Sequence, residues 1–255
     1  MKRILLTLAL VAATAVAPNA MAQLKWQPGK HYTVIPQQRS LVPAGKVEVM
    51  EVFSYGCPAC NQFRPVMKQL SAGLPKNAQM TYLPASWQAA ENWPTFQRAY
   101  LTAVSLGIAD KAHDAMYDAI WKTGELGIAD PNTRQLKKVL PSMEDIAKFY
   151  ERVAGVKKAA FVAASKSFAV DLKIKQAEAQ IKAMQVLSTP TLIVAGKYRV
   201  NNEAFRTVDE IIEMVNFLVA KETPAAAPAA AANPAASAKP AVAPVAAKPV
   251  APAKP

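Results

Sequence analysis

Apolar residues in the first part of the chain follow two different patterns. Residues 47–53 form a short run rich in β-branched and aromatic side chains, which is typical of a buried strand. After residue 58 the apolar side chains recur at helical spacing, at Phe63, Val66, Met67 and Leu70. Residues 73–77 break this helix, and residues 80–83 predict a second core strand. This strand–helix–strand succession favours a right-handed βαβ crossover with parallel strands.

The pattern is then helical from residue 86 to residue 187. Segments 96–106 and 109–122 each place apolar residues on one helix face, and residues 157–186 are long enough for one helix or two. No cluster of catalytic residue types stands out in this block. We therefore interpret it as a structural unit of helices.

Two polar signals predict where further helices of this block begin. Asp130 comes directly before Pro131, which predicts a short helix with Asp130 as its N-cap. Ser142 is followed three residues later by Asp145, an order that resembles a capping box with Asp in place of Glu.

The last part of the folded chain returns to strand character. Residues 188–195 predict a strand, residues 196–197 a hairpin turn and residues 198–200 the returning strand. Thr207 or Asp209 then starts a final helix with an apolar face.

The two ends of the chain have different compositions. Residues 1–22 carry Lys2 and Arg3, an apolar stretch and a small-x-small site at residues 20–22, which predicts a cleaved secretory signal. We expect the mature protein to be soluble, because no other stretch is long and apolar enough to span a membrane. Residues 222–255 are dense in proline and alanine, which predicts a disordered tail without a catalytic role.

The net charge of +12 changes this picture little. The basic residues are scattered along the helices and do not alternate with aromatic residues, so we expect a solvated basic surface and no nucleic-acid partner. Weak attraction to an anionic membrane surface stays open.

Cys57 and Cys60 are the only cysteines in the 255 residues. Pro58 suits the first position of a helix, which places Cys57 at the N-cap and Cys60 one turn inside. The N–H groups and dipole of a helix N-terminus favour a thiolate, so we expect the pKa of Cys57 to be lowered. Cys57 would attack first, and Cys60 would then release the product.

Other uses of this cysteine pair are less well supported. Two cysteines cannot form a four-thiolate zinc site, and both histidines are far away in sequence. A structural disulfide would close a loop of only a few residues and would add little stability. Export to an oxidising compartment and the Cys-X-X-Cys spacing together favour redox chemistry.

The remaining histidines and tryptophans are interpreted mainly as packing residues. His31 begins a predicted edge strand at residues 31–35 and is expected to be structural. His113 is expected to be a plain packing or surface residue. Trp87 and Trp93 lie where the strand region meets the helical block, and a groove lined by them stays open.

At this point the order of elements resembles the thioredoxin fold with a helical insertion, and specifically the exported DsbA-like thiol:disulfide oxidoreductases. Three features carry the resemblance. Residues 53–60, Phe-Ser-Tyr-Gly-Cys-Pro-Ala-Cys, end a strand, Thr189-Pro190 opens a later strand, and Glu51 precedes Cys57 by six residues.

The resemblance implies an α/β fold, with a central mixed sheet flanked by helices and a large all-helical insertion. The thioredoxin-like domain would comprise residues 23–85 and 188–221, and the insertion residues 86–187. The signal at residues 1–22 and the tail at residues 222–255 complete the division.

The resemblance also implies roles for site residues. Cys57 would be the exposed nucleophile and Cys60 the resolving thiol of a redox-active disulfide. Pro190 matches the family's cis-proline, which leaves the backbone before it free to pair with an extended substrate. Thr189 before it would tune the redox potential and the substrate fit, and Glu51 would relay the proton of Cys60.

One position departs from the best-known members of the family. They have Pro-His between the cysteines, whereas this chain has Pro58-Ala59. A histidine stabilises the thiolate, and alanine does not. We therefore expect a less oxidising disulfide than in the Pro-His members.

The predicted function is that of a periplasmic oxidoreductase that introduces disulfide bonds into exported proteins. The resemblance implies reduced exported proteins as substrates and a membrane quinone-linked reoxidase as partner. It implies no metal or organic cofactor, and we expect a monomer. A reductase or isomerase of the same fold, and a peptide-binding chaperone-like protein, stay as alternatives.

Overall fold

The computed structural model describes residues 25–223 of the chain. The predicted signal at residues 1–22 lies outside these residues, as does the predicted tail from residue 224 onward. Within the described part, no helix combines the length and the apolar character needed to cross a membrane.

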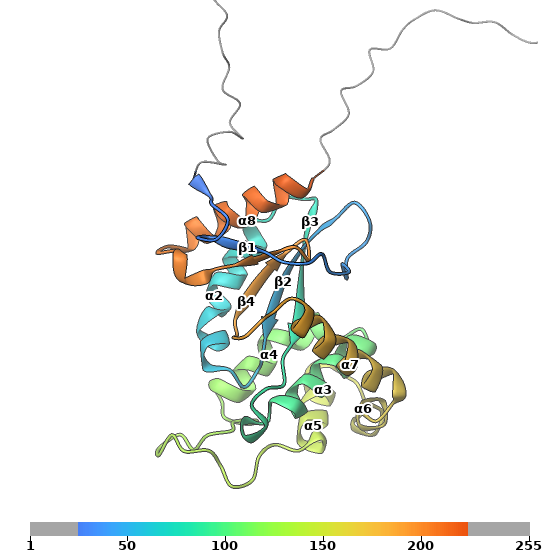
Figure 1. Cartoon of the computed structure of the whole chain (residues 1–255). Coiled ribbons are helices and arrows are strands. Elements are labelled where there is room, and N and C mark those ends of the chain that lie inside the picture. The colour runs from blue at the N-terminus through green and yellow to red at the C-terminus, as the bar shows by residue number, and fades with distance from the viewer. Residues whose placement is uncertain (1–24, 224–255) are drawn as a thin grey trace, which may run out of the picture. The chain divides into compact units, whose positions relative to one another are not determined.

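A five-stranded mixed sheet lies at the centre of the described residues, in the order β1-β5-β4-β2-β3 (Figure 1). Its strands are β1 (Tyr32–Val34), β2 (Val47–Phe53), β3 (Ala78–Pro84), β4 (Thr191–Val194) and β5 (Tyr198–Val200). Strands β2 and β3 are parallel, and the other neighbouring pairs are antiparallel. The predicted βαβ unit is confirmed.

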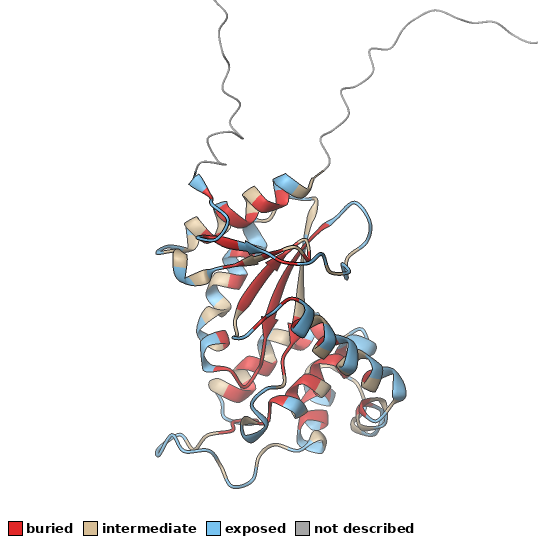
Figure 2. Ribbon diagram, viewed as in Figure 1, coloured by how far each residue is buried: buried red, intermediate tan, exposed pale blue. Residues whose placement is uncertain are grey.

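Strand β2 is the buried centre of this sheet, and all seven of its residues are buried. Strand β3 was predicted to be a core strand and is instead an edge strand, because it pairs with β2 alone. Its first five residues are at most half-buried, and only Leu83 and Pro84 are buried. Figure 2 shows the contrast between the two strands.

Two helices cover one face of the sheet. Helix α2 (Pro58–Gly73) and helix α8 (Val208–Glu222) contribute Met67, Leu70 and Leu218 to a cluster with strand side chains such as Val49. Thr207 caps α8, and Glu210 completes a capping box, so the first of the two predicted helix starts is the observed one. This cluster fixes α2 against the sheet, with its N-terminus at the carboxyl end of β2.

The helical insertion packs on the other side of the molecule (Figure 1). It contains α3 (Trp93–Ser105), α4 (Ala109–Trp121), α5 (Met143–Ala154), α6 (Lys158–Ser165) and α7 (Phe168–Ala183). The capping box of Ser142 and Asp145 begins α5 as predicted. The segment from residue 157 to residue 186 forms two helices, because Ser167 caps a new helix after α6 ends.

The helix predicted at Asp130 is wrong, because residues 122–142 form an irregular segment. Oδ1 of Asp130 does accept the backbone N–H groups of Asn132 and Thr133, at 2.9 and 2.8 Å. The chain then reaches Arg134 with a φ of 58°, a left-handed conformation that ends the turn. The capping signal was present, but only one turn follows it.

Short elements complete the chain. The hairpin between β4 and β5 turns at Ala195 and Gly196, which both have positive φ, one residue earlier than predicted. Two 3₁₀ helices lie at Ala89–Glu91 and Asn202–Ala204. The predicted structural role of His31 fits its position, because its Nδ1 accepts the N–H of Gln27 at 3.0 Å.

Candidate active site

Cys57 lies where β2 has ended and α2 begins. Its backbone N–H donates to the carbonyl of Ser54 at 3.1 Å, which closes the turn between the two elements. Cys57 is the N-cap of α2, and its Sγ accepts the backbone N–H of Cys60 at 3.4 Å. Pro58 occupies the first helical position, where a missing N–H has no cost. The predicted position of both cysteines is confirmed.

The environment of Cys57 favours its thiolate. Hydrogen bonding from the Cys60 thiol is the main cause that lowers the pKa of Cys57, to about 6. The side chain of Thr189 and the backbone N–H groups of Ala59 and Cys60 lower it further, and burial acts in the opposite direction. Both cysteines are free thiols in this structure. A low pKa keeps much of the Cys57 thiol ionised near neutral pH, which makes it a nucleophile and a good leaving group.

Cys57 is less accessible than expected. The residue is 5% exposed, whereas Cys60 is fully buried at 0%. The carbonyl of Thr189 lies 3.6 Å from Sγ of Cys57, and the ring of Trp93 lies against Gly56 so closely that a Cβ there would meet it at 2.7 Å. The expectation of an exposed nucleophile is therefore corrected: Cys57 is the more accessible of two buried thiols.

Thr189 and Pro190 come from the opposite end of the sequence to face the cysteines. The peptide bond between them is cis, as expected. The carbonyl of Pro190 accepts Nδ2 of Asn202 at 3.1 Å, and Thr191 donates its hydroxyl to the carbonyl of Ser188 at 2.7 Å. These bonds hold the loop at the start of β4 beside Cys57.

A hollow of about 670 Å³ adjoins this loop. We call it the Thr189 hollow. Its walls include residues of α2, of the Pro190 loop and of the 3₁₀ helix after β5, namely Ala59, Gln62, Phe63, Thr189, Pro190 and Asn202. Ala59 is exposed, so the position at which this chain departs from the Pro-His pattern faces the hollow.

Glu51 lies on the face of β2 that α2 covers. It is 2% exposed, and Oε1 has no hydrogen-bond partner within the described residues. Burial, together with the charge of Cys57, raises the pKa of Glu51 to about 8. The pKa of Cys60 is also raised, first by its hydrogen bond to Cys57, then by burial and by the charges of Cys57 and Glu51. Glu51 and the two cysteines therefore form one electrostatic unit.

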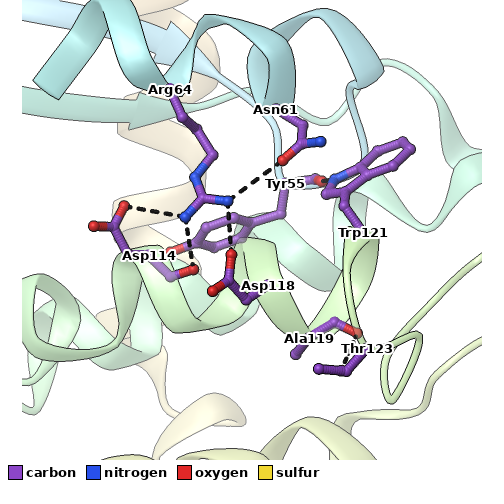
Figure 3. Close-up of polar contacts among 8 residues, drawn as sticks. All are labelled: Tyr55, Asn61, Arg64, Asp114, Asp118, Ala119, Trp121 and Thr123. Carbon is purple, nitrogen blue, oxygen red and sulfur yellow. Dashed lines mark hydrogen bonds and ion pairs between the residues drawn. The ribbon is translucent and has the colours of Figure 1, made fainter.

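The helical insertion holds the segment before Cys57 through Trp121, which was expected to be a core or interface packing residue, and it holds α2 through contacts of Arg64 that sequence reasoning missed. Nε1 of Trp121, at the end of α4, donates to the carbonyl of Tyr55 at 2.8 Å (Figure 3). Arg64 of α2 donates to Asp118 of α4 at 2.8 Å and also contacts Asp114. These contacts join residues fifty or more positions apart, so no local pattern in the sequence could indicate them.

His113 lies closer to this site than expected. Its Nδ1 lies 3.0 Å from the hydroxyl of Tyr55, and its ring centroid is 4.2 Å from that of Tyr82. Burial lowers the pKa of His113 to about 4, so the ring is neutral near pH 7. It is a packing residue, as predicted, and it packs against Phe53 and Tyr55, which lie just before Cys57 in the chain. Trp93 is buried and Trp87 is 38% exposed, and their ring centroids lie 6.3 Å apart.

Comparisons with known proteins agree with this geometry. A family model described as Thioredoxin matches residues 42–214. The thiol:disulfide interchange protein DsbA of Pseudomonas syringae pv. tomato is 31% identical over 226 residues, covering 89% of this chain and 98% of that protein. DsbA of Escherichia coli strain K12 is 27% identical over 231 residues, covering 87% and 100%.

Solved structures give the same result. The crystal structure of the oxidoreductase DsbA from Xylella fastidiosa has a TM-score of 0.65 and 31% identity, and the similarity covers 78% of this chain and 98% of that chain. The crystal structure of Pseudomonas aeruginosa DsbA has a TM-score of 0.63 and 30% identity, covering 78% and 95%.

The family match and the structural similarity establish the class: this is a thiol:disulfide oxidoreductase with a thioredoxin fold and a large all-helical insertion. The relatives narrow the class further, because they match over nearly their whole length. The chain belongs to the DsbA family of thiol:disulfide interchange proteins.

Proposed function

We propose that the oxidised Cys57–Cys60 pair introduces disulfide bonds into exported proteins. A substrate thiolate attacks Sγ of Cys57, which forms a mixed disulfide and releases the Cys60 thiolate. A second substrate thiolate then attacks the substrate sulfur of the mixed disulfide and releases the Cys57 thiolate. The substrate loses two electrons and two protons, and the cysteine pair gains both. No metal or organic cofactor is needed, because the dithiol carries both electrons.

The lowered pKa of Cys57 is the observation that supports the oxidising direction. Hydrogen bonds that stabilise its thiolate stabilise the reduced protein, which makes the disulfide a stronger oxidant. Ala59 contributes a backbone N–H but no side-chain charge. We propose that this makes the protein less oxidising than relatives with histidine between the cysteines.

Glu51 is proposed as the acid–base group for Cys60. When Cys60 leaves as a thiolate, a protonated Glu51 can return a proton to it. A pKa of about 8 keeps Glu51 mostly protonated at neutral pH, so the proton is available when the thiolate forms. The unpartnered Oε1 supports this role, because a purely structural buried carboxyl would be hydrogen-bonded.

Thr189 and Pro190 are proposed to bind the substrate backbone. They lie at the rim of the Thr189 hollow beside Cys57, where an extended segment attached to Sγ would pass. Pro58 and Ala59 are both exposed and would face the same segment. Together with Glu51 they complete the proposed set of residues that tune the exchange at Cys57 and Cys60.

We propose that residues 1–22 direct export to the periplasm and that the mature protein acts there as a monomer. Residues 23–85 and 188–221 would form the catalytic domain and residues 86–187 the insertion. The tail expected from residue 222 would begin after Glu222, because Glu222 ends α8 and pairs with Lys197. A membrane quinone-linked protein would reoxidise the dithiol. The names of the DsbA relatives support the exchange reaction, and the family resemblance supports the reoxidase.

A redox titration against glutathione tests the proposal. We expect the Cys57–Cys60 disulfide to be reduced at a low ratio of reduced to oxidised glutathione, and to oxidise a reduced test protein that has one native disulfide. A potential as low as that of a thioredoxin, about −270 mV, would contradict the oxidase role and favour a reductase. Disulfide formation that persists in Cys57→Ser would contradict the assignment of the site.

A further inference from the structure

A second hollow lies beside Cys57 and shares no lining residue with the Thr189 hollow. Its volume is about 800 Å³, within the range of about 300–1,000 Å³ that is usual for ligand sites. We call it the Pro58 hollow. Its lining includes residues beside Cys57, from the end of α4 and from the segment 122–142, such as Gly56, Pro58, Trp121, Lys122, Arg134 and Lys137. The residues directly before and after Cys57 in the chain, Gly56 and Pro58, therefore both line this hollow.

The outer wall of the Pro58 hollow is an irregular but well-anchored segment. Residues 122–142 leave the end of α4 and return to α5, and they form the long loop at the lower left in Figure 1. Leu126 and Ile128 are buried, and the backbone N–H of Lys137 donates to the carbonyl of Ile128 at 2.8 Å. Long loops without helices or strands are uncommon in compact domains, and those that are held in place are usually functional, for example as binding loops.

The acidic and the basic side chains that line this hollow differ in how many partners they have within the protein. Asp130 accepts hydrogen bonds from its own turn, and Glu91 accepts Nε1 of Trp93 at 3.1 Å. In contrast, Lys122, Arg134 and Lys137 form no salt bridge among residues 25–223. The acidic groups accept hydrogen bonds within the protein. The hydrogen bonds of its own turn lower the pKa of Asp130, and the charge of Lys137 also helps to lower it. Lys122 and Arg134 are therefore the basic groups most available to a bound molecule, with Lys137 beside them.

Apolar surface accompanies these cations. Leu136 lines the hollow and is 47% exposed, and Ile120, Ile128 and Pro131 also line it. A bound segment would therefore meet apolar side chains on the wall and cations on the segment 122–142. The matching chemistry is a polypeptide that combines apolar and acidic residues.

We propose that the Pro58 hollow binds the acidic and apolar part of a substrate polypeptide that flanks its reacting cysteine. The inference rests on the proposed function. Thr189, whose carbonyl lies 3.6 Å from Sγ of Cys57, lines the Thr189 hollow. Gly56 and Pro58, the two neighbours of Cys57 in the chain, line the Pro58 hollow, so Cys57 adjoins both hollows. A chain joined to Sγ of Cys57 in the mixed disulfide extends in two directions from it, and each direction has a hollow.

Two synthetic dithiol peptides of equal length test this proposal. One carries Leu-Glu repeats around its two cysteines, and the other carries Leu-Lys repeats. The oxidised protein converts each dithiol to a disulfide and is itself reduced. The peptide loses two hydrogen atoms, so mass spectrometry follows the rate of the reaction. We expect the Leu-Glu peptide to react about tenfold faster at low ionic strength, and the difference to fall near 1 M salt.

Charge reversal locates the effect. In Lys122→Glu/Arg134→Glu/Lys137→Glu we expect the preference for the Leu-Glu peptide to be lost. The matched control is Lys111→Glu/Lys157→Glu/Lys175→Glu, which changes the net charge equally at exposed positions that line neither hollow and should keep the preference. Both variants should give the far-ultraviolet circular dichroism spectrum of the parent, which shows that the fold is intact, and the control variant should also keep the glutathione equilibrium of the parent.

Each failure has a distinct meaning. If the parent oxidises neither peptide, the proposed function is wrong. If it oxidises both at equal rates, or if the two triple variants lose the preference equally, the exchange function stands and the Pro58 hollow is not a binding site.

Discussion

Cys57 and Cys60 are the same residue type three positions apart, yet their surroundings oppose each other. At the mouth of α2, hydrogen bonds from Cys60, Thr189 and Ala59 lower the pKa of Cys57 to about 6. On the floor beneath it, the hydrogen bond to Cys57, burial and the charge of Glu51 raise the pKa of Cys60. We call the surroundings of Cys57 the mouth and the surroundings of Cys60 and Glu51 the floor. The mouth offers hydrogen-bond donors to a thiolate and the floor favours the neutral thiol, so one fold gives two identical thiols different tasks.

Serine at each cysteine tests this division most strongly. Cys57→Ser and Cys60→Ser should both abolish the oxidation of a dithiol peptide, because each removes one sulfur of the disulfide. Cys60→Ser should still form a mixed disulfide with an activated peptide thiol near pH 7, whereas Cys57→Ser should not, because Cys60 is fully buried. Mass spectrometry detects the adduct, and an adduct of equal yield on both variants would contradict the division.

Glu51→Gln should remove a large part of the pH dependence of the free energy of unfolding of the reduced protein. Because the folded-state pKa of about 8 lies above the ordinary value of 4.5, ionisation of Glu51 opposes folding. The free energy of unfolding of the reduced protein should therefore lose on the order of a few kcal/mol as pH rises from about 4.5 to 8. In Glu51→Gln that loss should disappear, as measured by denaturant unfolding at a series of pH values.

In this variant the change in stability above about pH 6.5 reports the Cys57 thiol, because His113, whose pKa burial lowers from 6.5 to about 4, contributes only below that pH. The folded-state pKa of Cys57 lies below its ordinary value of 9.0, so its contribution to stability is full above pH 9 and is lost as pH falls through about 6. Reduced Glu51→Gln should therefore gain stability between pH 6 and pH 9. Glu48→Gln is the control: Glu48 lies on the opposite face of β2, where Thr81 donates its hydroxyl to it at 2.7 Å. Burial also raises the pKa of Glu48, but less than that of Glu51, so Glu48→Gln should remove only a smaller part of the loss of stability with rising pH. A parent-like stability profile in Glu51→Gln is the result that contradicts this assignment.

Ala59→His should lower the pKa of Cys57 further and so widen its difference from Cys60. A histidine at this exposed position can donate to the Cys57 thiolate, and each unit by which the pKa falls should make the disulfide about tenfold harder to keep oxidised against glutathione. Ultraviolet absorbance of the thiolate gives the pKa, and a glutathione titration gives the equilibrium. Ala59→Asn is a control of polarity without charge, and an equal shift in both variants would contradict a role of charge.

Trp121→Phe should have a smaller effect that leaves the contrast intact. It removes the donor to the carbonyl of Tyr55 while an aromatic ring remains, so the free energy of unfolding should fall by about 1–3 kcal/mol. Thermal or denaturant unfolding measures this change. The pKa of Cys57 should stay within experimental error of the parent value, because Trp121 donates to neither sulfur. A clear rise in that pKa would mean that the insertion tunes the mouth directly.

Local signals in the sequence predicted much of the fold because they act over a few residues. The buried strand at residues 47–53, the helix beginning at Pro58 and the capping box at Ser142 are all present. The helix predicted at Asp130 is absent because a capping signal also acts over only a few residues. It stabilises the first turn but does not make the following residues continue as a helix. The role of β3 as an edge strand also depends on which strands lie beside it, and no local pattern reports that.

The sequence by itself determined the chemistry: two cysteines at a helix N-terminus, a following proline, an acid on the preceding strand and a distant Thr-Pro pair. Only the tertiary structure decided how these groups act on one another. It brought Thr189 to 3.6 Å from Cys57, left Oε1 of Glu51 buried without a partner among residues 25–223, and set the insertion's Trp121 against Tyr55. The physical reason is distance. Burial and hydrogen bonding shift a pKa only between groups in contact, and contacts between residues 66 and 132 positions apart are made by folding alone.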